Sequence, residues 1–174
     1  MPVTFTKVSL PNGWLGNMSP YPVRYAGLEW RTTEHLFQAL RFDDPAIREE
    51  IRGEKSPFAA KLLAKRHEDE MLVEPTSPAD LANMELCLRL KLDQHPDLKD
   101  LLVATGDEVI VEDVTSRASG GRHLFWGMTF RENGWVGENR LGRLWMRLRG
   151  EMQGACSDDP QIGVSLELAE ATAI

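Results

Sequence analysis

The stretch SPADLANMELCLRLKLDQHP, residues 77–96, decides how this chain folds. Ser77 offers a side-chain oxygen to the free amides of a first helical turn, and Pro78 at the first helical position loses no hydrogen bond. Apolar residues then recur at offsets of three and four, at Leu81, Met84, Leu88 and Leu92. Such a stripe is typical of a helix with one buried face. We therefore predict a helix over residues 78–93 that crosses the core and ends before Pro96.

Other helices are indicated by the same signals. Asp44 and Ser56 also precede a proline, Thr32 precedes a helical apolar pattern, and Gly150 follows one. The helices predicted from these signals cover residues 33–42, 45–52, 57–67 and 139–149, with a further helix through Leu98, Leu101 and Leu102 before Gly106.

Strand signals are few and short. Residues 3–9, 21–30 and 109–114 are the segments whose composition favours strands. A chain of 174 residues is long enough for one domain and too short for two ordinary ones, so we predict a single domain over residues 1–149. Residues 150–174 have weak periodicity and no Lys or Arg, so we interpret them as an acidic C-terminal appendage.

The net charge of −7 argues against one class of function. A protein that coats a nucleic-acid backbone with its whole surface needs a broad positive field, which this chain lacks. Five of the 27 acidic residues lie in the appendage, so the rest of the chain has 22 acidic residues against 20 basic ones. That near balance still permits a local cationic patch for a small phosphorylated ligand.

Metal, cofactor and membrane functions have no support in the sequence. Cys87 and Cys156 are expected to be reduced thiols, and the four histidines show no ligand spacing, so no metal site and no cofactor are predicted. No apolar run approaches the roughly 20 residues that span a bilayer. The N-terminal sequence lacks the features of a secretion signal, so we expect a cytoplasmic protein without a membrane partner.

Three segments carry candidate chemistry, and the first is LEWRTTEHLFQALRF, residues 28–42. Glu34, Gln38 and Arg41 are spaced by four and three residues, which places a carboxylate, an amide and a cation on one helical face. With His35 beside them, these groups could bind a polar ligand. The simpler interpretation is a capped helix whose charged groups pair with one another, and this segment alone favours it.

The second segment is GWVGENRLGR, residues 134–143. Its glycines before a helix start could let a phosphate approach free amides, while Arg140 and Arg143 add positive charge. Its spacing is neither that of a dinucleotide-binding motif nor that of a P-loop. The simpler alternative, a loop that enters an amphipathic helix with a solvated arginine face, is again favoured by the segment alone.

The third segment is HLFWG, residues 123–127. Trp126 could stack on a planar base, and Gly127 permits close approach of the backbone. A place in the core is the commoner role for such a tryptophan. No nucleophile-elbow sequence accompanies the serines of this chain, so a hydrolase triad is not predicted.

Taken together and in this order, the segments resemble the NADAR superfamily, the YbiA-like N-glycosidase group. The resemblance runs from about Trp14 to Arg149, and its order and spacing carry it rather than any single piece. The matching pieces are LGNMSP (15–20), WRTTEHLFQA (30–39), KLDQHP (91–96), LLVATG (101–106), FWG (125–127) and NRLGRL (139–144). The resemblance implies a compact, mainly helical α+β fold.

The resemblance also implies an activity. Family members hydrolyse N-glycosidic bonds of phosphorylated riboflavin intermediates, or remove ADP-ribose from modified guanine in nucleic acid. Cleavage of such a bond builds positive charge at the anomeric carbon of the ribose, which a carboxylate can stabilise while it activates water. Glu34 matches the family's catalytic glutamate, and Arg41 is expected to bind or stabilise charge beside it. The residues expected to bind substrate are Asn17, Trp30, His35, His123, Trp126, Asn139, Arg140 and Arg143.

Three positions depart from the family pattern. Arg41 stands where family members commonly have a lysine, proposed as a nucleophile in the branch that removes ADP-ribose. A guanidinium stays protonated and is a poor nucleophile, so a covalent lysine mechanism is not expected here. Thr76 or a neighbour replaces a tryptophan, and His123 replaces an acidic residue.

We therefore expect a hydrolase that cleaves the N-glycosidic bond of a phosphorylated ribosyl nucleotide, or of an ADP-ribosyl adduct such as ADP-ribosylated guanine. ADP-ribosylated nucleic acid is a further expected partner. The three departures keep open a noncatalytic module that binds ADP-ribose or a nucleotide, and also a purely structural role in an assembly.

Overall fold

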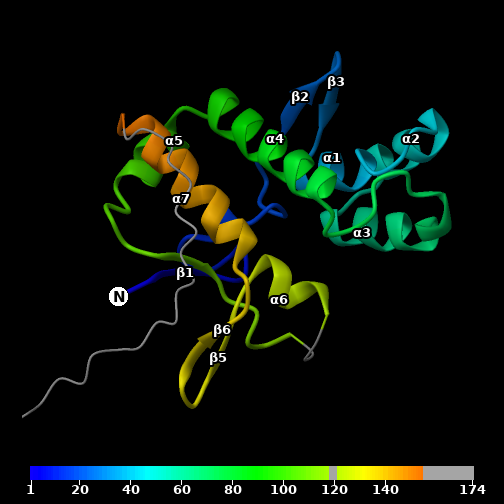
Figure 1. The fold of residues 1–174 in the computed structure, drawn as a ribbon. Helices are drawn as coiled ribbons and strands as arrows, with labels where there is room; N and C mark the ends of the chain where they lie inside the picture. Colours follow the sequence, from blue (N-terminus) through cyan, green and yellow to red (C-terminus); the bar gives the residue numbers. More distant parts are fainter. Residues whose placement is uncertain (118–120, 155–174) are drawn as a thin grey trace, which may run out of the picture.

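The computed structural model describes residues 1–117 and 121–154. In these residues the chain forms seven α-helices and three two-stranded sheets (Figure 1). The helices are α1 (Thr33–Ala39), α2 (Pro45–Gly53), α3 (Pro57–Arg66), α4 (Pro78–Gln94), α5 (Asp97–Val103), α6 (Arg122–Trp126) and α7 (Arg140–Met152). The strands are β1 (Val3–Phe5), β2 (Val23–Tyr25), β3 (Leu28–Trp30), β4 (Ile110–Glu112), β5 (Thr129–Arg131) and β6 (Gly134–Val136). The mainly helical α+β fold expected from the sequence is confirmed.

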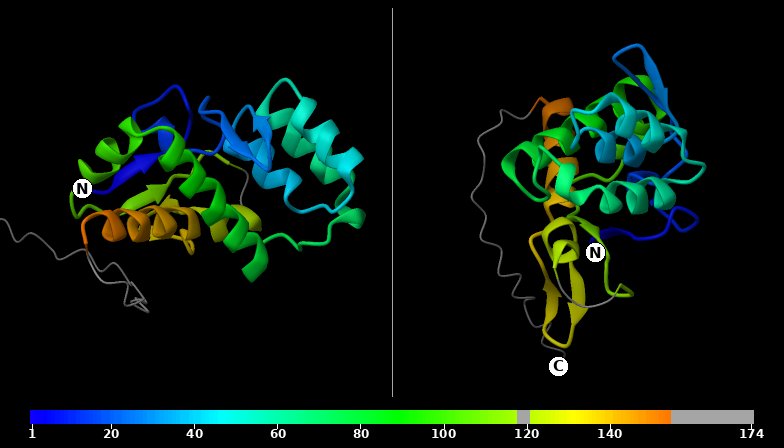
Figure 2. Two further views of the ribbon diagram at one scale, coloured as in Figure 1. Left: turned by 90° about the horizontal axis from the view of Figure 1, so that it is seen from above. Right: turned by 90° about the vertical axis from the view of Figure 1, so that its right-hand side faces the viewer.

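Helix α4 crosses the core, as its apolar stripe predicts. It lies between α1 and α7 and contacts both helices (Figures 1 and 2). Met84, Leu88 and Leu92 are buried on it, and Leu81 packs against the same core from its edge. The burial of this stripe joins the N-terminal helices to the last helix of the fold.

The predicted helix starts are also confirmed. The side chains of Thr32, Asp44, Ser56 and Ser77 each accept a hydrogen bond from a backbone amide in the first turn of α1, α2, α3 or α4, respectively. Each cap satisfies an amide that has no partner within the helix, and three of the four are followed by proline at the first helical position.

The sheets are small and separate. Strands β1 and β4 pair in parallel, and this pairing brings residues 3–5 beside residues 110–112. The other two sheets are antiparallel pairs, β2 with β3 and β5 with β6. The β5–β6 pair extends away from the body of the domain (Figure 2).

The structure corrects several sequence-based boundaries. Helix α1 ends at Ala39 rather than residue 42, because the chain turns there and Arg41 O accepts bonds from the amides of Leu72 and Val73. Helix α7 continues through Gly150 to Met152, where Glu151 pairs with Arg89 of α4. The rest of the predicted appendage, from residue 155, lies outside the described residues.

Three elements were not expected, and one of them is strand β5, in a segment where no strand was predicted. Helix α6 has only five residues, too few to show a helical apolar period. Residues 134–136, predicted as part of a glycine loop, form strand β6 instead. Within the described residues, none of the helices has the length and apolar character that crossing a membrane requires.

Lys91 is the one lysine among the fully buried residues of the described core. Its Nζ donates to the carbonyl oxygens of Trp14 and Gly16 and to Ser19 Oγ, at 3.0 Å for Gly16 and 2.7 Å for Ser19. Burial lowers the pKa of Lys91 to about 7. The three acceptors offset this cost and tie the loop before β2 to helix α4.

Substitution Lys91→Met should lower the free energy of unfolding by about 2–4 kcal/mol, because it leaves buried acceptors without a donor. Lys99→Met on α5 is the matched control, since Lys99 forms only an exposed ion pair with Asp93. Urea unfolding of the two variants measures the difference. Equal midpoints would contradict a structural role for Lys91.

Candidate active site

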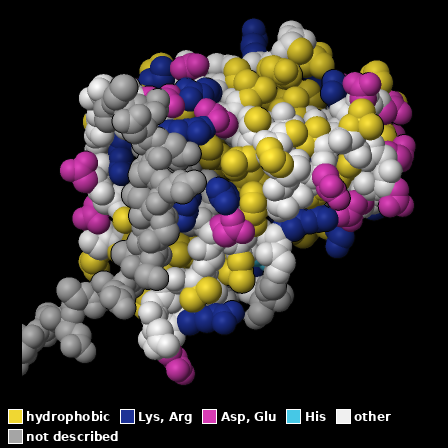
Figure 3. Space-filling view, viewed as in Figure 1, with side chains coloured by type: hydrophobic (Ala, Val, Ile, Leu, Met, Phe, Trp, Pro, Cys, Tyr) yellow, Lys and Arg dark blue, Asp and Glu magenta, His cyan; other side chains and the backbone are white. Residues whose placement is uncertain are grey.

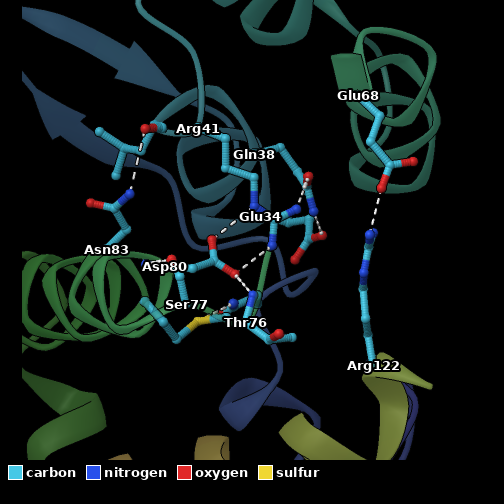
Figure 4. Close-up of polar contacts among 12 residues, drawn as sticks. Glu34, Gln38, Arg41, Glu68, Thr76, Ser77, Asp80, Asn83 and Arg122 are labelled. Carbon is cyan, nitrogen blue, oxygen red and sulfur yellow. Dashed lines mark hydrogen bonds and ion pairs between the residues drawn. The ribbon is translucent and has the colours of Figure 1, made fainter. Parts of the chain in front are cut away.

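Four connected polar side chains join α1 to α4: Glu34 and Gln38 on α1, Arg41 just after its end, and Asp80 in the first turn of α4 (Figure 4). Gln38 Nε2 donates to Glu34 Oε1 at 2.8 Å, and Arg41 Nη1 donates to Gln38 Oε1 at 2.8 Å. Arg41 then forms a bidentate pair with Asp80, with both nitrogen–oxygen distances at 2.8 Å. We call these four residues the polar row. All four are buried, so their orientations are set by the fold.

The Arg41–Asp80 pair joins α1 to the first turn of α4. Asp80 is fully buried, and its second oxygen also accepts a bond from the backbone amide of Thr76 at 2.8 Å. Thr76 itself has a left-handed backbone, with φ at +69°, an uncommon state for a β-branched residue. The loop before α4 is therefore held in a strained turn that presents an amide to Asp80.

Asn17 fixes the other end of the row. Its carbonyl oxygen accepts a bond from the amide of Glu34 at 3.0 Å and another from Thr33 Oγ1 at 3.1 Å. Its side-chain amide points at Met84 Sδ in α4. Asn17 is thus a residue that positions the first turn of α1, and its predicted contact with substrate stays a prediction.

A chain of ring contacts leads from the polar row to the last helix. The Arg41 guanidinium lies 4.5 Å from the ring centre of Phe37, and Phe37 meets Trp126 edge to face at 5.6 Å. Trp126 meets Phe125 at 4.9 Å, and Phe125 lies beneath the Arg140 guanidinium at 5.7 Å. These contacts therefore connect α1, α6 and the start of α7, which are far apart in sequence.

Two glycines allow this meeting. A side chain at Gly127 would overlap the carbonyl oxygen of Glu112, and one at Gly137 would overlap the carbonyl oxygen of Gly127. Gly137 also has a φ of +143°, which L side chains rarely adopt. The glycines around Trp126 thus serve close backbone packing, and this role is distinct from the phosphate contact predicted from the sequence.

The predicted phosphate-binding residues differ in exposure. Asn139 is buried, and its side chain accepts from the amide of Glu112 and donates to the carbonyl oxygen of Ile110 at 2.8 Å. It therefore anchors the start of α7 against β4. Arg140 is partly exposed and pairs with Glu138 at 2.9 Å, and Arg143 is exposed on the next turn. Both arginines remain candidates for a phosphate contact.

His35 and Trp30 face away from the polar row. His35 is fully buried, with Nδ1 at 2.9 Å from Thr32 Oγ1 and Nε2 at 3.2 Å from the carbonyl oxygen of Glu54. Burial lowers the pKa of His35, which favours the neutral ring. Trp30 lines a hollow of about 180 Å³ with Leu36 and Ala39, on the opposite face of α1 from Glu34. Contacts of these two residues with substrate remain predictions.

Helix α6 forms one edge of the region. Arg122 bonds Glu68 of the short 3₁₀ helix Glu68–Glu70, and so connects α6 to the segment after α3 (Figure 4). His123, on the same helix, is half-buried, and burial lowers its pKa, with the nearby charges of Lys61 and Arg117 adding to the effect. A neutral imidazole is therefore favoured where the family pattern has an acid.

Glu112 is a residue that sequence reasoning missed. It ends strand β4, is 8% exposed, and its Oε1 accepts a bond from Arg117 Nη1 at 2.8 Å. Burial raises its pKa, the charge of Glu34 raises it further, and Arg117 and Lys61 lower it. The available signal was a pair of acids, Glu112 and Asp113, inside the apolar run of residues 109–114.

The surface around these residues is mixed in charge. Lys and Arg side chains alternate with Asp and Glu over the face shown in Figure 3, without a continuous basic surface. Across residues 1–117 and 121–154, no group of three or more His, Cys, Asp or Glu side chains could hold a metal ion.

This fold and site have known relatives. Residues 4–153 match the NADAR domain, so the chain belongs to the NADAR family. N-glycosidase YbiA of Shigella boydii is 34% identical over 150 residues, covering 86% of this chain and 88% of that protein. The NMR structure of Escherichia coli YbiA has a TM-score of 0.71 and 33% identity, with coverage of 88% of this chain and 87% of that one. These likenesses confirm the family and the fold expected from the sequence.

A more distant relative is a riboflavin biosynthesis protein. The chloroplastic riboflavin biosynthesis protein PYRR of Zea mays is 29% identical over 167 residues. The match covers 87% of this chain and 25% of that protein, so it concerns one part of a much longer polypeptide.

Substitution Asp80→Asn should lower the free energy of unfolding by about 3–5 kcal/mol, because it leaves the buried Arg41 charge without its carboxylate. Replacing both partners, as Arg41→Met with Asp80→Leu, should cost less than Asp80→Asn alone, since no unpaired charge remains. Urea unfolding provides the comparison. Glu49→Gln, in the exposed pair with Arg52, is the control and should cause no measurable change. A similarly small effect of Asp80→Asn would show that the pair does not organise the site.

Proposed function

We propose that this protein is an N-glycosidase that hydrolyses the bond between a ribose and a nitrogen base in a phosphorylated ribosyl nucleotide or an ADP-ribosyl adduct. One observation carries the proposal. Glu34, which the family resemblance marks as the catalytic glutamate, is held in a buried and connected polar row, and ring contacts through Phe37 link that row to Trp126. The relatives named as N-glycosidases support the reaction class.

Glu34 has the geometry of the carboxylate that such a reaction needs. One of its oxygens is fixed by Gln38 at 2.8 Å, and its backbone amide is fixed by Asn17 at 3.0 Å. A preorganised carboxylate stabilises the charge that develops at the anomeric carbon, and it can take a proton from the attacking water. Gln38 thereby positions the group that does the chemistry.

Arg41 has a different part in this proposal from that of a nucleophilic lysine. Three of its guanidinium hydrogens are engaged by Asp80 and Gln38, and the group lies against Phe37. The guanidinium remains charged, and Gln38 links it to the Glu34 carboxylate by hydrogen bonds. Water, rather than a protein side chain, is then the nucleophile.

The other end of the region suits the rest of a nucleotide. Trp126 offers an aromatic surface to a base or sugar, and the guanidinium groups of Arg140 and Arg143 can bind phosphate oxygens through charge-assisted hydrogen bonds. A mixed surface charge also fits a small phosphorylated ligand better than a long nucleic acid held by its backbone. An ADP-ribosyl group on nucleic acid would present the same sugar and phosphate chemistry.

Substitution Glu34→Gln should reduce turnover at least 100-fold while the protein stays folded, because the amide cannot accept the proton of water. The assay incubates the protein with a panel of phosphorylated ribosyl nucleotides and ADP-ribosylated guanine, and measures the released base by mass spectrometry. Glu29→Gln, exposed on β3, is the control. Full activity of Glu34→Gln would refute the role of Glu34.

A binding module without catalysis is the alternative, since Arg41 replaces the lysine of the family pattern and is held by Asp80. Calorimetry on the same substrate panel distinguishes the two functions. Binding heat without any released base from the wild-type protein would favour the binding module.

Substitutions Arg140→Ala and Arg143→Ala should each raise KM about 10-fold or more for a 5′-phosphorylated substrate, because each removes a charge-assisted bond. The same substrate without its phosphate should show no such change. Arg147→Ala, one turn further along α7 and paired with Glu85, is the control. Equal effects on both substrates would mean that the two arginines do not contact phosphate.

A further inference from the structure

The side chain of Glu112 is the least satisfied acid in the described core. Its Oε1 is bonded to Arg117, whereas its Oε2 is buried and has no hydrogen-bond partner among the residues that the structure describes. A buried polar atom without a partner costs free energy, so such atoms in folded proteins usually have a functional or structural reason. The buried Oε2 of Glu112 therefore needs such a reason.

The backbone of Glu112 lies against the candidate active site. Its amide donates to Asn139 Oδ1 at 3.2 Å, and its carbonyl oxygen accepts from Met128 N at 2.8 Å. These bonds place it between the segment that carries Trp126 and the start of α7 that carries Arg140. The end of β4 is thus fixed to two of the three segments that form the site.

Electrostatics connect Glu112 to the third segment. The charged groups whose fields act on its carboxyl are Glu34 of α1, Lys61 of α3 and Arg117 of the loop after β4. Burial is the largest effect and raises the pKa of Glu112, so its proton is retained more strongly than that of an ordinary glutamate. The carboxyl of Glu112 therefore lies within electrostatic reach of Glu34.

Hydrolysis of a glycosidic bond commonly uses two carboxyl groups, one that gives a proton to the leaving group and one that activates water. We propose that Glu112 is the general acid of the N-glycosidic cleavage, giving its Oε2 proton to the leaving nitrogen while Glu34 takes a proton from the attacking water. The proposal rests on the proposed function and adds a second catalytic residue to it.

The step balances in atoms and charge. The bond between the anomeric carbon and nitrogen breaks, its electron pair goes to nitrogen, and the Glu112 proton joins that nitrogen. The water oxygen bonds to the anomeric carbon, and its proton goes to Glu34. Arg117, already bonded to Oε1, then pairs with the carboxylate left on Glu112. Exchange of protons with solvent restores both groups for the next turnover.

The test compares wild-type protein with Glu112→Gln across pH 4 to 10 in the base-release assay, with the substrate of the panel that the wild-type protein cleaves. Glu112→Gln should lower kcat about 100-fold or more, the usual contribution of a general acid, with little change in KM. Wild-type kcat should fall as pH rises through the pKa of Glu112, because the acid is lost. The variant should show no such fall.

Two further variants separate catalysis from structure. Glu112→Asp keeps an acid, so it should retain part of the turnover and also the loss at high pH. Glu132→Gln, exposed in the β5–β6 turn, should match the wild-type protein at every pH. If Glu112→Gln fails to fold, the profile of Glu112→Asp decides: an alkaline fall supports the general acid, and a flat profile overturns it.

The possible failures can be told apart. Suppose that the wild-type protein releases base, and that Glu112→Gln keeps the wild-type kcat and its fall at high pH. This result would overturn the role of Glu112 and leave the N-glycosidase proposal standing. A wild-type protein that releases no base from any member of the panel would overturn both proposals.

Discussion

The buried pair of Arg41 and Asp80 is the constraint on which this site depends. A guanidinium in the core must be neutralised, and Asp80 does so with two parallel bonds that only one arrangement of α1 against α4 permits. The remaining guanidinium bond passes to Gln38 and so to Glu34. The orientation of the Glu34 carboxylate is therefore a consequence of how two helices pack.

The second requirement is that residues far apart in the chain meet at this face. The edge-to-face contact of Phe37 with Trp126 joins the first helix to α6, and Asn139 joins α7 to the β4 strand. Glycines at 127 and 137 let these backbones approach closely enough. The NADAR fold thus gathers a carboxylate, an aromatic surface and arginines from three separate segments.

Local structure could be predicted from the sequence, because caps and apolar periods act within a few residues. The four side-chain caps and the core position of α4 were predicted for this reason. Pairings across long separations were not, since Arg41 and Asp80 are 39 residues apart and nothing near either residue indicates the other. The sequence also suggested that Arg41 pairs within its own helix, and the bond to Gln38 confirms that part.

The site residues also divide into those that a motif predicts and those that only the structure reveals. Glu34 was identified by its motif, whereas Glu112 has no motif of its own and becomes a candidate only through its burial and its unpartnered oxygen. His35 and Asn139 belong to matching motifs, yet their polar atoms bond the protein itself. A motif therefore locates a region of the structure, and hydrogen bonds then separate residues that shape it from residues that face a ligand.

Substrate is proposed to bind on the Glu34 face of α1. Trp126 of α6 contacts Phe37 of this helix, whereas Trp30 of β3 lines the hollow on its opposite face, so the two indole groups distinguish the faces. Titration of ¹⁵N-labelled protein with ribose 5-phosphate, followed by NMR, reports on the indole N–H groups of Trp126 and Trp30. We expect saturable shifts at Trp126 and Arg140 with Trp30 unmoved. Shifts confined to Trp30 and the hollow that it lines would contradict the account.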